Sequence, residues 1–168
     1  MNKPGRKLLP LLLLALAAAG TAACDGTVTE ITGDGIEAVW AGKPWAGDAS
    51  ARLVGAAGDT LLLVGSTPPG SGAMAAAYVR VSAPVRGVGS YPLGPGDAEL
   101  TYLIGGDVRT AAYATTRAEA GVLTVRELGA GWVSGTVTFD ATASFGSAPV
   151  GPTATFSGNY RARVERLR

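Results

Sequence analysis

The sequence predicts an all-β domain, either an antiparallel β-sandwich or a flattened β-barrel of about 9–10 strands. Three observations support this fold class. Short segments alternate between apolar and polar residues, which is the period of a half-buried strand. Turn residues such as Gly, Pro and Asp recur at intervals of about 8–12 residues. No window of a dozen residues places apolar side chains at helical spacing.

The strands follow from these patterns in chain order. Residues 36–40 alternate, and Gly42-Lys43-Pro44 indicates a turn before residues 45–54, which predicts a hairpin. Residues 61–64 are continuously apolar, which is typical of a short strand buried on both faces. A loose edge strand is expected at 27–31, loops at 66–75 and 145–153, and further strands at 76–82, 87–93, 99–104, 108–115, 122–128, 132–142 and 155–164.

One predicted strand shows its two faces clearly. In residues 132–142 the odd positions Val133, Val137 and Phe139 are apolar and are expected to face inward. The even positions are polar and are expected to face water: Ser134, Thr136, Thr138 and Asp140.

The N-terminus has the organisation of a secretory signal. Lys3, Arg6 and Lys7 form a cationic head before an apolar run at 8–19, which is too short to cross a bilayer as a stable helix. Small residues follow, and Thr21-Ala22-Ala23-Cys24 resembles a bacterial lipobox, with Thr21 where leucine is usual. Because Cys24 is the only cysteine, it has no disulfide partner, and we expect it to carry the lipid.

This signal predicts three segments and a location. Residues 1–23 are expected to be a lipoprotein signal peptide, 24–35 the lipidated cysteine and a polar tether, and 36–168 the β domain. Two or more acyl chains hold a protein firmly at a membrane. We therefore predict a lipid-anchored protein of the bacterial cell envelope with its domain in the periplasm, and the choice between inner and outer membrane stays open.

Composition argues against several classes of function. Without Lys3, Arg6 and Lys7 the chain has eleven basic and thirteen acidic side chains, unlike the positive surface that nucleic-acid binding requires. The sequence has no histidine, the side chain that most often activates serine nucleophiles or binds zinc. We predict no catalytic residues, no metal and no cofactor, and a protein that is not an enzyme.

Short sequence motifs resemble those of a family of uncharacterised bacterial lipoproteins. In that family a first strand ends in a turn of the form Asn/Asp-Gly-Lys-x-Trp, which resembles Ala41-Gly42-Lys43-Pro44-Trp45 here. A mid-chain Gly-x-Tyr-x-Leu resembles residues 89–93, and a late Ser-Gly-Thr-Phe-x-Phe strand resembles residues 134–139. Ala41 replaces Asn or Asp, and Val137 replaces the first Phe. The resemblance covers about residues 36–164 and implies a small all-β domain with a lipid anchor, but no activity.

Two groups of side chains are candidate contact residues. Trp40, Trp45 and Trp132 would form an aromatic platform for a sugar ligand if they share a surface, whereas the ends of strands are also where large rings fill a core, the interpretation that the sequence favours. The second group is a basic C-terminal end that would contact anionic lipid headgroups or remain a solvated strand face: Arg161, Arg163, Arg166 and Arg168.

These observations favour a non-enzymatic binding or structural accessory module whose partner is unidentified, with an envelope protein and a small apolar ligand as the candidates. One alternative is a lipocalin-like carrier, because many inward positions are small and would leave a cavity for a small apolar ligand. The other alternative is a carbohydrate-binding module. Glu37, Asp97, Glu99 and Asp107 supply enough carboxylates for a glycosidase pair, but their spacing does not bring two of them together.

Overall fold

The computed structural model describes residues 33–67, 77–104, 109–145 and 148–166, and within these ranges every regular element is a β-strand. Ten strands form one sheet. They are β1 (Gly35–Trp40), β2 (Lys43–Val54), β3 (Thr60–Ser66), β4 (Ala77–Pro84), β5 (Gly89–Leu93), β6 (Ala98–Ile104), β7 (Arg109–Ala114), β8 (Gly121–Gly129), β9 (Trp132–Phe145) and β10 (Ala148–Arg166). The all-β prediction is confirmed, and the strand expected at 27–31 lies outside the described residues.

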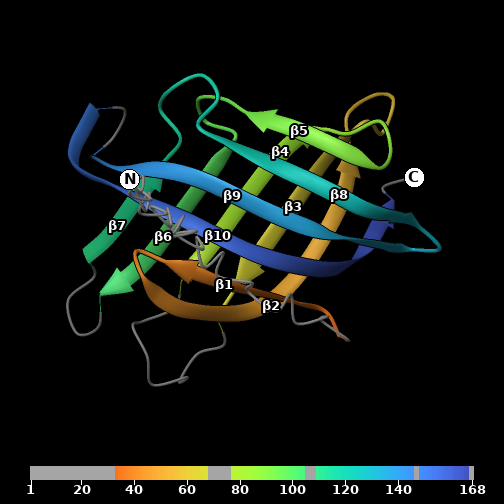
Figure 1. Ribbon diagram of the computed structural model, residues 1–168, viewed down its shortest axis with the longest axis horizontal. Helices are drawn as coiled ribbons and strands as arrows, with labels where there is room; N and C mark the ends of the chain where they lie inside the picture. The colour runs from red at the N-terminus through yellow and green to blue at the C-terminus, as the bar shows by residue number, and fades with distance from the viewer. Residues whose placement is uncertain (1–32, 68–76, 105–108, 146–147, 167–168) are drawn as a thin grey trace, which may run out of the picture.

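Eight of the strands close into a ring, in the order β1-β2-β3-β4-β6-β7-β9-β10. The ring closes through antiparallel pairing of β1 with β10, and a short parallel contact joins residues 164–166 of β10 to residues 51–53 of β2. One edge of β9 pairs with β10. The opposite edge pairs with β7 at residues 142–144 and with β8 at residues 132–139, and β5 pairs with β8. Because these two strands extend beyond the ring, the fold is not a regular barrel. Figure 1 shows β8, β9 and β10 crossing in front of β3, β4 and β6.

A row of aromatic side chains lies in the interior of the ring of strands. Trp40 on β1 pairs with Phe156 on β10, and Phe156 pairs with Phe139 on β9. The rings of Phe139 and Phe156 stack with their centroids 5.1 Å apart. On β8 the row ends at Gly121, where an added Cβ would lie 2.6 Å from the Cβ of Phe139. Burying each large side chain contributes about 1.5–3 kcal/mol, so this row is a major part of the core.

Strand β3 departs from the predicted burial. Leu61 and Leu63 are fully buried, but Leu62 and Val64 are only half-buried, so the expectation of burial on both faces is wrong for the outer face. Among the described residues, no second layer of strands covers the outer face of β3. Leu62 and Val64 instead lie opposite Arg52 and Arg80, whose apolar stems can cover them while the charged ends reach Glu165 and Glu99.

The turn before β2 is tighter than predicted. Ala41 and Gly42 have φ of 49° and 77°, and positive φ at both central residues is typical of a type I′ turn between two strands. Lys43 and Pro44 therefore belong to β2 and not to the turn. Ala41 takes a conformation that favours Asn, Asp or Gly, the first two of which the resembled family has there.

The loop predicted at 145–153 is largely wrong. β9 runs to Phe145, and β10 begins at Ala148, with Ala148 opposite Phe145 and Pro149 opposite Ser144. The register then shifts between Pro149 and Thr153. Gly151 and Pro152 fall within this irregularity, where a proline without an N–H is tolerated. The proline and glycine signals therefore mark a bulge inside a long strand.

Candidate functional site

Two of the three candidate tryptophans belong to the interior. Trp40 is 8% exposed, and its ring meets Tyr113 edge-on at a centroid distance of 5.0 Å. Trp45 is half-buried and meets Phe156 edge-on at 5.6 Å. Its ring lies over Gly47 and Gly65, where an added Cβ would approach the indole to 2.9 Å and 3.0 Å. The indole N–H of Trp45 is buried and has no hydrogen-bond partner among the described residues. The indole side chains of Trp40 and Trp45 are thus part of the packed interior of the domain.

Trp132 lies apart from this pair. It starts β9 at an outward position, seven residues before Phe139, which corresponds to about 23 Å along the strand. The guanidinium carbons of Arg161 and Arg163 lie 4.3 Å and 5.3 Å from the centre of its ring. The three tryptophans therefore do not share one surface, and the structure does not assemble the predicted aromatic platform.

Only part of the predicted basic end can be placed. Arg161 and Arg163 project from the outer face of β10 beside Trp132, and Arg163 lies 3.7 Å from the carboxylate of Asp34. The side chain of Arg166 and the whole of Arg168 lie outside the described residues, as does Cys24. Arg161 and Arg163 therefore contact Trp132, although the sequence analysis placed the arginines and the tryptophan in two separate candidate groups.

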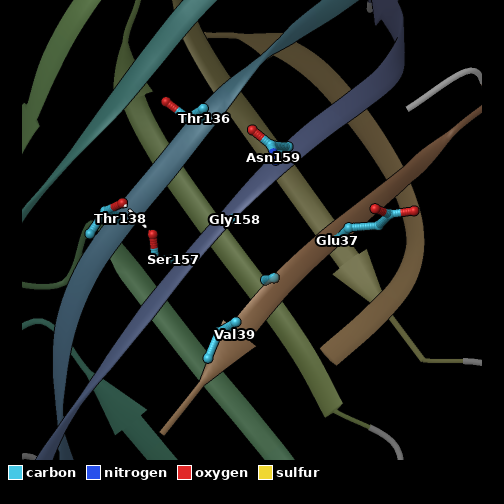
Figure 2. Close-up of a pocket in the computed structure, with 8 residues that line it drawn as sticks. Glu37, Val39, Thr136, Thr138, Ser157, Gly158 and Asn159 are labelled. Carbon is cyan, nitrogen blue, oxygen red and sulfur yellow. Dashed lines mark hydrogen bonds between the residues drawn. The ribbon is translucent and has the colours of Figure 1, made fainter. Parts of the chain in front are cut away.

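The outer face of β1, β10 and β9 carries an open groove of about 440 Å³. Figure 2 shows side chains from all three strands at its surface. They are Glu37 and Val39 from β1, Ser157 and Asn159 from β10, and Thr136 and Thr138 from β9, with Ala38 and Gly158 completing the lining. Most of the side chains that line this groove can donate or accept hydrogen bonds.

Strand register aligns these groups into rows. Glu37 lies opposite Asn159, and Asn159 lies opposite Thr136. The same row continues to Thr124 on β8 and Ser90 on β5, whose hydroxyl oxygens are 3.2 Å apart. With strands about 4.8 Å apart, the five residues extend over about 19 Å. We call Glu37, Asn159, Thr136, Thr124 and Ser90 the polar row.

Part of the polar row has no internal partner. Among the described residues, neither the Glu37 carboxylate nor the Asn159 amide makes a hydrogen bond or an ion pair. In the neighbouring row, Thr138 and Ser157 share a hydrogen bond of 2.9 Å. The amide of the half-buried Asn159 offers two donors and an acceptor, and the carboxylate of the exposed Glu37 offers acceptors only. Together they suit a ligand whose own groups both donate and accept, such as a sugar hydroxyl.

The other candidate carboxylates have structural partners. Glu99 pairs with Arg80 at 3.1 Å, and Asp97 accepts a 2.7 Å hydrogen bond from the backbone N–H of Gly94. Asp107 lies outside the described residues. Within the described ranges, no group of three His, Cys, Asp or Glu side chains could hold a metal ion. The described chain also contains no helix long and apolar enough to cross a membrane.

The small inward residues mark tight contacts. An added Cβ at Gly158 would lie 2.5 Å from the carbonyl oxygen of Glu37, and one at Gly65 would lie 2.6 Å from the side chain of Ile36. At Gly135 it would overlap the Thr124 carbonyl oxygen. These positions are small because neighbouring backbone or side chains occupy the adjoining space. The space beside these three glycines is therefore filled, and the carrier hypothesis stays a prediction.

Comparison with known protein families, with curated proteins and with solved structures gives no match to this chain. The resemblance to bacterial lipoproteins therefore stays a prediction from the sequence motifs, and the arguments about function rest on the residues themselves.

Proposed function

We propose that this protein is a non-enzymatic binding module of the bacterial cell envelope, held at a membrane by lipid on Cys24. The sequence supports the anchor, because small residues and a single cysteine follow an apolar run of signal-peptide length. The absence of histidine from the sequence supports a role in binding, since the usual general base and zinc ligand is missing. The domain then acts as an accessory module on the periplasmic side.

The polar row is the surface that contacts the ligand in this proposal. The observation that carries it is the alignment of Glu37, Asn159 and Thr136 across three strands, with the first two unpartnered in the described structure. A neutral carbohydrate presents hydroxyl groups that can accept from the amide and donate to the carboxylate. The groove is open, so an extended glycan can lie across the strands without entering the core.

Recognition of a glycan by the polar row would use hydrogen bonds, whereas the predicted tryptophan platform would use stacking on aromatic rings. Trp40 and Trp45 are engaged in the core, so hydrogen bonds from the sheet surface must supply the recognition. Each hydrogen bond to a neutral group contributes about 0.5–1.5 kcal/mol net. A ligand held by a few such bonds binds weakly, and repeated contacts along a glycan strengthen the attachment.

Binding to a panel of neutral oligosaccharides and polysaccharides tests the proposal. Asn159→Ala should weaken binding about tenfold, because it removes a donor and an acceptor worth about 1.4 kcal/mol together. Stability should hardly change, since the Asn159 amide has no partner to lose in the described structure. Ser50→Ala, an exposed change on β2 outside the groove, is the matched control. Equal binding by wild type and Asn159→Ala, or no binding to any glycan, would contradict a carbohydrate site here.

A further inference from the structure

We propose that the end of the ring that carries Trp132, Arg161 and Arg163 faces the membrane, with these side chains in contact with the phosphate groups of phospholipid headgroups. The inference rests on the proposed lipid anchor at Cys24. It adds an orientation, which the anchor alone does not specify.

Trp132 is the tryptophan whose position suits a membrane interface. Trp40 and Trp45 contact Phe156 in the interior, whereas Trp132 lies on the outer face beside two arginines. Tryptophan is enriched at membrane–water interfaces because its ring is apolar and its N–H is polar. Because Trp132 is not a core residue, its indole can contact the headgroup region without disturbing the packing of the interior.

The two arginines supply hydrogen-bond donors for phosphate. A guanidinium whose carbon lies within about 6 Å of an aromatic ring centre makes a cation–π contact, and it keeps five N–H donors in its own plane. Arg163 is the main donor, because 75% of its side chain is exposed, whereas Arg161 is half-buried and has a further interaction of its own. A phosphodiester group offers the acceptors that this planar fork matches. Tryptophan and arginine thus recognise two parts of the same headgroup layer.

Among the described residues, each of the two arginines has an acidic side chain nearby, so the inference does not depend on a net positive charge. Asp34 lies 3.7 Å from Arg163, and Glu127 on β8 accepts a 3.3 Å hydrogen bond from Ser134, the residue opposite Arg161. Recognition of phosphate by the donors themselves does not require an excess of cations. Zwitterionic as well as anionic phospholipids should therefore support the contact, and salt should weaken it only modestly.

The chain enters the fold at this same end. Gly35 is the first residue of β1 and lies opposite Arg161, whereas Trp40 at the far end of the strand lies opposite Phe156. Nine residues separate Cys24 from Asp34, and such a segment spans at most about 35 Å when fully extended. A lipid on Cys24 thus holds the Trp132 end near the bilayer surface and gives its side chains a high effective concentration of headgroups.

Fluorescence quenching in membranes tests the orientation. The lipidated protein is reconstituted into vesicles of phosphatidylethanolamine and phosphatidylglycerol that contain a lipid with a quencher near its headgroup. Quenching of tryptophan emission is expected in the wild type and should be largely lost in Trp132→Phe. It should persist in Trp45→Phe, the matched control that removes an interior indole. Arg163→Gln should reduce the quenching, and circular dichroism checks that each variant is folded.

The possible failures of anchor and orientation are distinguishable. Flotation of wild type with the vesicles, and its loss in Cys24→Ala, supports the anchor. If the wild type does not float, both the anchor and this inference fail. If it floats but shows no quenching, or if Trp132→Phe is quenched as strongly as wild type, the orientation is overturned while the anchor stands.

Discussion

Replacing Gly135 by alanine should destabilise the fold by about 2–4 kcal/mol, because neighbouring atoms of β8 and β10 occupy the space that the added methyl group would need. An added methyl group would overlap the carbonyl oxygen of Thr124 and would lie 2.9 Å from the hydroxyl of Tyr160. That hydroxyl donates a 3.2 Å hydrogen bond to the same carbonyl oxygen. Forcing a methyl group into a packed interior costs about 1–3 kcal/mol, and loss of the hydrogen bond adds about 1 kcal/mol.

Thermal and urea unfolding followed by circular dichroism measure this effect. At about 3 °C per kcal/mol for a domain of this size, Tm should fall by about 6–12 °C. Gly129→Ala is the matched control in the same pair of strands, since an added Cβ there meets nothing within 4 Å. It should change the free energy of unfolding by no more than about 1 kcal/mol. Equal losses in the two variants would refute the argument that close approach requires Gly135.

The remaining predictions concern Tyr160 and Trp45. Burial, with a smaller contribution from Tyr91, raises the pKa of the Tyr160 hydroxyl above its ordinary value, so the folded state keeps this proton at a pH where the unfolded state loses it. The contribution of the Tyr160 proton to the free energy of unfolding is fully present below about pH 10. Above that pH the free energy of unfolding should fall by up to about 1.4 kcal/mol per pH unit, because the unfolded state loses the proton and the folded state keeps it. Urea unfolding between about pH 9 and about pH 11 should show a shallower decline for Tyr160→Phe, and identical slopes would contradict this cause. Trp45→Ala should cost about 3 kcal/mol in thermal unfolding because Trp45 packs on Phe156, while glycan binding at the groove should be unchanged. A small loss of stability would instead place Trp45 in a surface role.

Local alternation of residues predicted most of the strands but not how they pair. The even positions from Ser134 to Asp140 are polar, and they lie on the outer face as expected. The partnership of β1 with β10 joins opposite ends of the chain, and no local pattern specifies it. Proline and glycine near residue 150 indicated a loop because the sequence does not show that β9 provides a partner across a bulge.

The candidate site was less predictable than the fold, for a related reason. Glu37, Thr136 and Asn159 are unremarkable in the sequence, and they become neighbours only through the pairing of β1, β10 and β9. The outward position of Trp132 could have been predicted, because the even-numbered residues of its strand face outward. Trp40 could likewise have been assigned to the core, because it lies on the same face of its strand as the buried Ile36. The contact of Arg161 and Arg163 with Trp132 again depends on β9 lying beside β10.

The closing role of β10 has a consequence for the timing of biogenesis. This strand is the last in the chain, yet it pairs with β1, β2 and β9 and completes the ring. Contacts between distant parts of a chain form slowly, since a long loop must first be closed. In a chain that crosses a membrane N-terminus first, as the signal predicts, β1 emerges long before its partner does. For a chain exported in this way, the ring could not close until β10 had followed β1 across the membrane, and the unpaired strands would be open to proteases until then.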